Sequence, residues 1–172
     1  MHISDFVAID TMDIFKDKEN EKMAIRNIVQ VGDDVLRQKC APVEEFDEKL
    51  WLLLDDMKET VKKEEGAGLA APQVGILRRV VVVDVEEGYF EFVNPKITKQ
   101  SGEQNGWEGC LSVKGKQGVV SRPMKVTLHF QDRNGNPFVL KAKGFFARAI
   151  CHELDHLDGV LYIDRASHVE KV

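Results

Sequence analysis

The sequence of 172 residues predicts an α+β fold, and two observations on its strand and helix signals lead to this prediction. Several short strand signals surround one long helix signal, without the regular strand–helix alternation of a doubly wound sheet. An Asn134-Gly135 pair between two strand signals is typical of an antiparallel hairpin. The length suits one domain with one core and leaves no room for a second full domain.

The individual elements are predicted from local patterns. A helix from about Asp47 to Lys63 is expected because apolar residues recur there with helical period, and Gly66 and Gly68 end it. The β-branched run 80–85 predicts a strand. Further short strands are expected over 90–93, 118–121, 125–131 and 138–142, and a second long helix over 145–157.

Residues 1–22 differ from the rest of the chain, since they are rich in acids, lack Gly and Pro, and end in a charge run. We therefore divide the chain into an N-terminal extension of uncertain origin, 1–22, and a single domain, 23–172. An upstream start codon or an expression remnant is one interpretation of the extension. A short regulatory or docking helix with Phe6, Ile9 and Phe15 on one face is the other.

The composition is that of an ordinary soluble globular protein, with 43% apolar and 31% charged residues. A formal net charge of −5 argues against a general nucleic-acid binder, which usually carries a basic patch. No apolar run approaches the ~20 residues that a membrane helix needs, and a secretory signal is not apparent. Three cysteines without framework spacing indicate reduced thiols, and we expect a cytoplasmic protein.

The segment C-H-E-L-D-H over 151–156 carries the chemistry. His152 and His156 are four residues apart, so on a helix both imidazoles lie on one face and can chelate one divalent metal. Glu153 lies about 100° round the helix, where it can exchange protons with water without ligating the metal. This is the His-Glu-x-x-His arrangement of hydrolytic zinc sites.

An amphipathic helix with two incidental histidines is the alternative. Phe145 and Ala149 fall on the histidine side, which indicates a buried, apolar-lined face, and two unpartnered histidines there are costly. Only the arc of Arg148, Cys151 and Asp155 fits solvent or polar contacts. This distribution favours the metal site.

A catalytic site of this type needs a third protein ligand. Tyr162 stands where one metalloprotease class has a third His. Another class uses a downstream Glu on a further helix, but Glu170 sits in an apparent tail. The ligand is therefore expected upstream. Cys110, within the glycine-rich segment 106–112, is the best candidate, although a lone cysteine is often just a small buried hydrophobe. Cys40, Cys151 and His129 have weaker support.

Three segments together resemble the motifs of the bacterial peptide deformylases. They are Gly-Ala-Gly-Leu-Ala-Ala-Pro-Gln at 66–73, Glu-Gly-Cys-Leu-Ser at 108–112 and His-Glu-Leu-Asp-His at 152–156. The likeness extends over about residues 23–165 and implies sheets packed around a central helix that bears the His-Glu-x-x-His motif. Taken alone, the first segment would indicate only a packing turn. Lys114 and Gln117 depart from residues common in the family.

The resemblance implies a metal-dependent hydrolase that removes the N-formyl group from the N-terminal formyl-methionine of newly synthesised polypeptides and releases formate. It implies one divalent ion per chain, Fe²⁺ in the cell, with Zn²⁺, Ni²⁺ or Co²⁺ as substitutes. The expected partners are N-formyl-Met nascent peptides. Ribosome association is an open expectation. The sequence carries no direct nucleic-acid signature, and a membrane is not an expected partner.

The resemblance also implies a role for each matching residue. Its metal ligands would be Cys110, His152 and His156, with Glu153 as general base and then acid. The oxyanion hole would use the Gln73 side chain and the Leu111 backbone N–H. Peptide-binding roles would fall to Gly68, Gly109, Phe145 and Ala149, and Arg148 is a further candidate for contact with the peptide backbone.

Three other functions remain open. A metallopeptidase could use the same helix, although Tyr162 and the Cys110 motif count against it. A non-catalytic binding module would be expected to lack a ligand or Glu153, and both are present. A structural zinc domain usually closes its site with four protein ligands, and the sequence offers three convincing ones.

Overall fold

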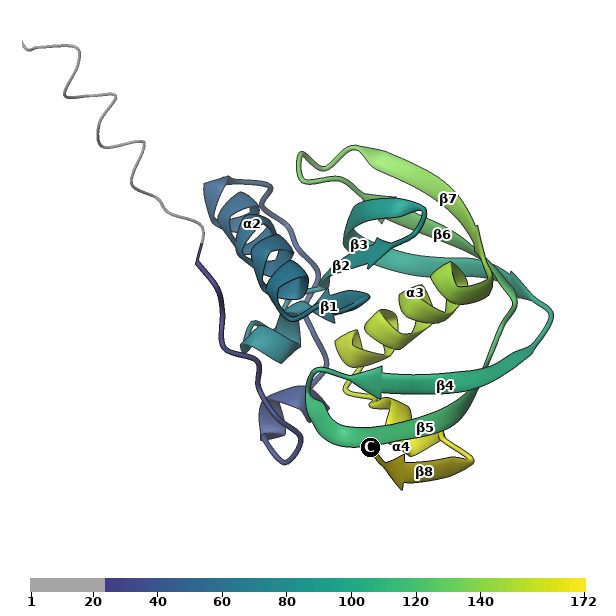
Figure 1. Ribbon diagram of the computed structural model, residues 1–172. Helices are drawn as coiled ribbons and strands as arrows, with labels where there is room; N and C mark the ends of the chain where they lie inside the picture. The colour runs from purple at the N-terminus through teal and green to yellow at the C-terminus, as the bar shows by residue number, and fades with distance from the viewer. Residues whose placement is uncertain (1–23) are drawn as a thin grey trace, which may run out of the picture.

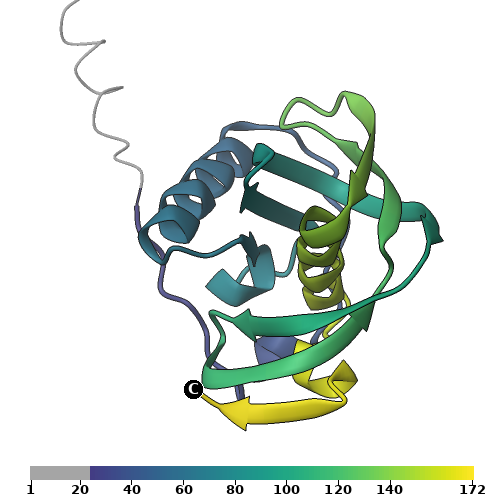
Figure 2. The same cartoon turned by 45° about the vertical axis from the view of Figure 1, so that its right-hand side comes forward.

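A computed structural model describes residues 24–172, in which two antiparallel sheets enclose one long helix (Figures 1 and 2). The strand order is β1-β2-β3-β6-β7 in the larger sheet and β4-β5-β8 in the smaller. Helix α3 (Gly144–Leu157) contacts both sheets, and helix α2 (Glu48–Lys63) packs on β1 and β2. The predicted α+β class is confirmed. The extension 1–22 lies outside the described residues, so the proposed domain division stays a prediction.

The remaining elements are short. The strands are β1 (Gly68–Ala70), β2 (Val80–Val85), β3 (Gly88–Ser101), β4 (Gln104–Cys110), β5 (Val113–Arg122), β6 (Lys125–Gln131), β7 (Pro137–Lys143) and β8 (His168–Lys171). Short helical turns are η1 (Asp34–Arg37), η2 (Ala71–Val74) and α4 (Tyr162–Arg165). Among residues 24–172, no helix combines the length and the apolar character that crossing a membrane requires.

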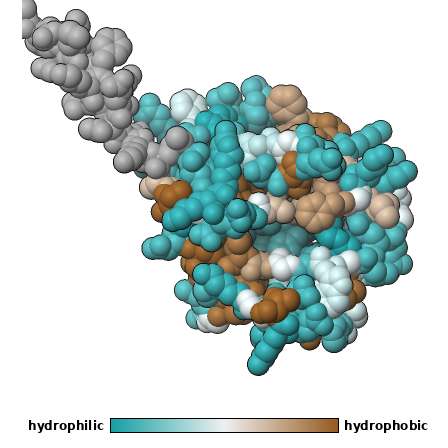
Figure 3. Space-filling view, viewed as in Figure 1, coloured by the Kyte–Doolittle hydropathy of each residue, from teal (hydrophilic) through white to brown (hydrophobic). Residues whose placement is uncertain are grey.

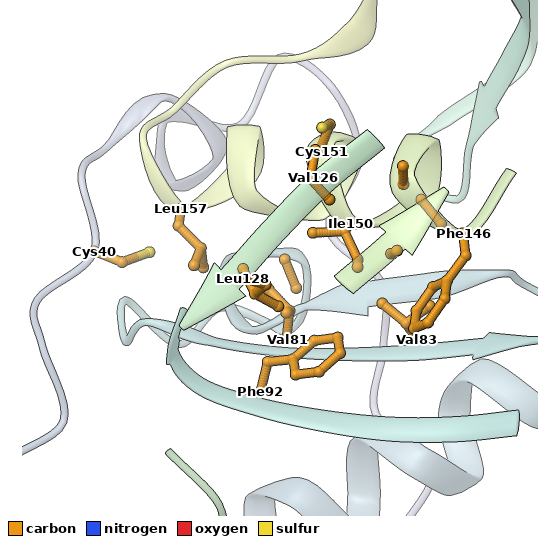
Figure 4. Close-up of a cluster of buried hydrophobic side chains, with 14 residues drawn as sticks. Cys40, Val81, Val83, Phe92, Val126, Leu128, Phe146, Ile150, Cys151 and Leu157 are labelled. Carbon is orange, nitrogen blue, oxygen red and sulfur yellow. The ribbon is translucent and has the colours of Figure 1, made fainter. Parts of the chain in front are cut away.

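Strand β2 is buried on both faces, which explains its continuous run of valines. Val81 and Val83 belong to the core cluster that contains Ile150 of α3 (Figure 4). Val80 and Val82 belong to the cluster under α2. The larger sheet thus lies between two apolar clusters, and α3 packs in one of them.

Helix α2 and the β6–β7 hairpin form as predicted. The Asp47 side chain accepts a hydrogen bond from the Leu50 amide and caps the helix at its predicted start. In the hairpin loop, Gly135 adopts a φ of +84°, which favours glycine. The Asp132 carboxylate accepts hydrogen bonds from the amides of Asn134 and Asn136 and holds the loop in shape.

Several strands were not predicted from the sequence. Strand β3 runs far beyond the expected 90–93, and its register with β6 is irregular in two places. The prediction of a tail around Glu170 is wrong, because this residue lies in β8, which pairs with β5. There the Glu170 carboxylate accepts a hydrogen bond from Gln117. Strand β4, which ends at Cys110, contains glycines that weaken its strand signal.

Candidate active site

A pocket of about 330 Å³ lies between α3, β1 and β4. The space-filling view looks onto a hollow bordered by hydrophobic side chains between the positions of α3 and β4 (Figure 3). Nine of the ten site residues predicted from the sequence line this pocket: Gly68, Gln73, Gly109, Cys110, Leu111, Phe145, Ala149, His152 and Glu153. The tenth, His156, is buried and only 1% exposed.

Three potential metal ligands meet at the pocket. The ligand atoms of Cys110, His152 and His156 all lie within 4.8 Å of one another. The Cys110 Sγ atom is 3.4 Å from His156 Nε2. The helix brings the two histidines onto one face, and the end of β4 brings the thiol over them. One thiolate and two imidazoles form a donor set that suits zinc or ferrous iron and leaves a coordination position open.

Glu108 fixes the orientation of His152. Its Oε1 atom accepts a hydrogen bond from His152 Nδ1 at 2.8 Å, which leaves Nε2 as the nitrogen available to a metal. Arg122 donates to both carboxylate oxygens at 2.9 Å, and Arg148 donates to Oε2 at 2.6 Å. Burial alone would raise the pKa of Glu108, but the hydrogen bonds from Arg122 and His152 hold this pKa well below its usual range.

The ion pairs continue from Glu108 toward the surface. Arg122 Nη1 lies 2.7 Å from Asp155 Oδ2, and Asp155 also accepts from Arg165 at 2.7 Å. Arg122 is 5% exposed, whereas the Arg165 side chain is half exposed. A series of ion pairs therefore leads from His152 to solvent. It supplies the buried Glu108 carboxylate, which orients His152, with hydrogen-bond donors.

The electrostatics of the cluster favour a cation. Burial lowers the pKa of His152, but its hydrogen bonds with Cys110 and Glu108 outweigh burial and raise this pKa to about 10. Burial and the neighbouring His152 hold the pKa of His156 well below its usual range. The site thus attracts one positive charge near Cys110, and a bound divalent ion can replace the proton that otherwise supplies it.

Glu153 is buried beside this cluster. Among the described residues, no group donates a hydrogen bond to its buried Oε2 atom. Burial raises the pKa of the Glu153 carboxyl to about 7, so the group can accept and release a proton near neutral pH. A Cβ atom at Gly68 would lie 2.7 Å from Glu153 Oε1, which shows how closely the β1 backbone approaches the carboxylate.

Gln73 is held in one orientation at the pocket wall. Its Oε1 atom accepts from the Ala70 amide at 2.9 Å, so its Nε2 must face the other way. That nitrogen donates to Ser112 Oγ at 3.1 Å and lies 3.5 Å from Cys110 Sγ. Leu111 directly follows Cys110 in the sequence, and its carbonyl accepts a hydrogen bond from the Gln30 side chain at 3.0 Å. Both predicted oxyanion-hole residues therefore line the pocket beside the candidate metal ligands.

Other sequence expectations need correction. Cys151 is buried and belongs to the apolar core rather than to an exposed arc, although it borders a hollow that Arg122 and Asp155 also line. The polar contacts expected for Arg148 are present, because this buried side chain donates to Glu108 and to the Val120 carbonyl. Arg148 also lines the pocket, and its contact with a peptide stays a prediction. Phe145 is 60% exposed at the pocket rim, whereas the buried histidine face begins at Ala149.

The cysteines and the histidine with weaker support as ligands, and Tyr162, lie outside the candidate metal site. Cys40 and Cys151 belong to the apolar core, where burial raises the pKa of each thiol to about 11. The Tyr162 ring stacks on the His152 ring at a centroid distance of 6.0 Å, so it packs against a candidate ligand. His129 is exposed on β6.

Sequence reasoning missed the supporting residues. Glu108 was recognised only as part of a motif, and Arg122 and Gln30 had no role at all. An acid that directly precedes Gly109 and Cys110 within a ligand motif is the sequence signal for Glu108. For Arg122 and Gln30 the local sequence offers none, because each meets its partner through tertiary structure.

Comparisons with known proteins agree with this geometry. A family model described as polypeptide deformylase matches residues 25–172. A peptide deformylase of Caldicellulosiruptor bescii is 53% identical over 143 residues, which cover 83% of this chain and 86% of the relative. Crystal structures of peptide deformylases from Legionella pneumophila and Thermotoga maritima superpose with TM-scores of 0.81 and 0.82 at 42% and 39% identity. Each covers 84% of this chain, and the matches span 87% and 99% of those chains.

Proposed function

The chain belongs to the polypeptide deformylase family, and on this basis we propose which of its residues carry out the family's reaction. That reaction is the metal-dependent hydrolysis of the N-formyl group from the formyl-methionine of new polypeptides, with release of formate. The observation that carries the proposal is the convergence of Cys110, His152 and His156 beside a buried Glu153 with an unpartnered oxygen.

Cys110, His152 and His156 hold the ion in this proposal. The ion, when bound, supplies a Lewis acid that lowers the pKa of a water molecule toward ~7. Glu153 accepts a proton from water and later delivers it to the leaving amine. The unpartnered Oε2 supports this role, because it is free to receive that proton.

The developing charge on the formyl oxygen is stabilised by two donors. Gln73 presents its Nε2–H group, since Ala70 fixes the opposite end of the amide. The Leu111 backbone N–H is the second donor. One such donor is typically worth ~10²–10³ in rate.

The pocket wall supports the peptide-binding roles. Gly68 and Gly109 lie on opposite sides of the pocket, on β1 and β4, and offer backbone groups to an extended peptide. Phe145 and Ala149 line the apolar end for the methionine side chain. The substrate is the N-terminus of a new polypeptide, so we place the enzyme in the cytoplasm and near the ribosome.

The identity of the ion is part of the proposal. A site of one thiolate and two imidazoles accepts ferrous iron, zinc, nickel or cobalt. We propose Fe²⁺ as the working ion, with the others as substitutes. A thiolate beside ferrous iron is prone to oxidation, so activity should decay in air with Fe²⁺ and persist with Ni²⁺ or Co²⁺.

The test is formate release from formyl-Met-Ala-Ser by protein purified without oxygen and supplied with Fe²⁺. Wild type should release formate, and Cys110→Ala should lose both the ion and at least about 10²-fold of the rate. Cys40→Ala, which removes a buried thiol that does not line the pocket, is the matched control and should keep both. A folded, metal-loaded wild type without formate release would overturn the proposal, and so would a Cys110→Ala variant that binds metal normally.

A further inference from the structure

The outward face of β3, β6 and β7 carries a cluster of lysines. We call it the lysine face, and it consists of Lys96, Lys99, Lys125, Lys141 and Lys143, all exposed. The three stretches that supply them, 96–101, 125–129 and 139–143, contain no Asp or Glu, although the chain as a whole carries a net charge of −5. Charge is therefore segregated onto one side of a sheet in an acidic protein.

Strand register brings these lysines together. Lys125 lies directly opposite Lys143, and Thr127 lies between Lys99 and Lys141 on the neighbouring strands. Cross-strand partners point to the same face, and residues two apart along a strand share it too. The cluster does not show as a charge run in the sequence, because its lysines come from three strands that are separate along the chain.

The lysine face has no partner of its own. Among residues 24–172, none of its lysines takes part in an ion pair. Like charges directly opposite on paired strands are destabilising, as between Lys125 and Lys143. A repulsive arrangement that no ion pair within the fold offsets is a candidate for function.

A hollow of about 590 Å³ lies over the lysine face. Its lining combines four of the lysines with the side chains of Ser101, Thr127 and His129, and includes no Arg, Phe, Trp or Tyr. Lysine and hydroxyl donors are typical contacts to phosphate oxygens, whereas base reading and base stacking use Arg forks and aromatic rings. We infer that the lysine face binds the phosphate backbone of RNA without reading its sequence.

The position of the lysine face fits an enzyme that works on new polypeptides. Its opposite side, with Val126, Leu128 and Ala142, packs in the core against α3, so the sheet lies between the bound polyanion and the helix that carries the histidines. The pocket therefore stays open while RNA is bound. The choice of RNA rests on the proposed function, because RNA is the polyanion beside a polypeptide during its synthesis.

The test is binding of a fluorescein-labelled RNA hairpin of mixed sequence, followed by anisotropy at several KCl concentrations. The logarithm of the binding constant should fall linearly with the logarithm of the salt concentration. In K141Q/K143Q the slope should shrink by about 2, since each lysine that contacts a phosphate contributes about 1. K99Q/K125Q, a second variant on the same face, should behave alike.

The matched control is K62Q/K63Q, which removes the same charge from two exposed lysines at the end of α2 and should bind RNA as wild type does. Equal weakening in this control would overturn the inference, because net charge alone would then explain binding. Absence of RNA binding by wild type, or equally tight binding of a poly-glutamate peptide, would overturn it as well. Formate release from formyl-Met-Ala-Ser should be the same in all four proteins, which separates this test from that of the proposed function.

Discussion

His152 Nδ1 lies 2.8 Å from Glu108 Oε1, so a carboxylate on the smaller sheet orients an imidazole that α3 contributes to the metal cluster. Glu108 is itself held by Arg122 and Arg148. The hydrogen bonds from Arg122 and His152 outweigh burial and keep the pKa of Glu108 well below its usual range. The position of the candidate ligand His152 therefore depends on residues outside the proposed ligand set.

Glu108→Gln should weaken metal binding about 10- to 100-fold, because a neutral amide orients His152 less firmly than the carboxylate. The free energy of unfolding should also fall, since Arg122 and Arg148 lose their buried counter-charge. Competition with a chelator measures the affinity, at a temperature where the metal-free variant is folded. Glu103→Gln, an exposed residue next to β4, is the control. Unchanged affinity in Glu108→Gln would rule out the positioning role.

Glu153→Gln should keep the fold and the bound metal but lose about 10²- to 10⁴-fold in turnover, because the amide cannot accept the proton. Metal content and formate release from formyl-Met-Ala-Ser are measured on the same preparation. Glu64→Gln, an exposed change at the end of α2, should leave both unaltered. Turnover near the wild-type level would show that another group handles the proton.

Gly68→Ala should destabilise the protein by about 1–3 kcal/mol, because the added Cβ would meet Glu153 Oε1 at 2.7 Å. Glu153→Asp shortens the facing side chain and should relieve part of this cost. A double-mutant cycle on the free energy of unfolding by urea measures the coupling. Additive effects of the two substitutions would mean that the β1 backbone and Glu153 do not press on one another.

Cysteine alkylation should distinguish the three thiols. In metal-free protein at pH 8, iodoacetamide should modify Cys110 first, because burial raises the pKa of the Cys40 and Cys151 thiols to about 11. Bound Zn²⁺ should protect Cys110. Mass spectrometry of tryptic peptides reports each site. Modification of Cys110 that is equally fast with and without Zn²⁺ would exclude it as a ligand.

The elements that the sequence predicts well are those with a strong local signal. The valine run of β2 is buried on both faces, and α2 begins at a capping Asp47, so pattern and structure agree. Strand β4 has no such signal. It forms because β5 pairs with it, and glycines within it serve close approach at the site, as Gly106 does beside Arg148.

The same distinction applies to the site. The spacing of His152 and His156 places both on one helix face, and this can be deduced locally. The contact of Glu108 with His152 joins residues 44 apart in sequence and exists only once the smaller sheet lies on α3. Arg122 likewise reaches Glu108 from a strand whose pairing no local pattern reveals.

Cys110 belongs to the smaller sheet, whereas both histidines belong to α3, whose apolar side packs in the core of the larger sheet. An ion held by all three would join the two layers, and its binding free energy would be added to the free energy of unfolding. The abundance of the enzyme would then follow metal supply. A cell short of the ion would lose folded protein to proteolysis as well as catalytic turnover.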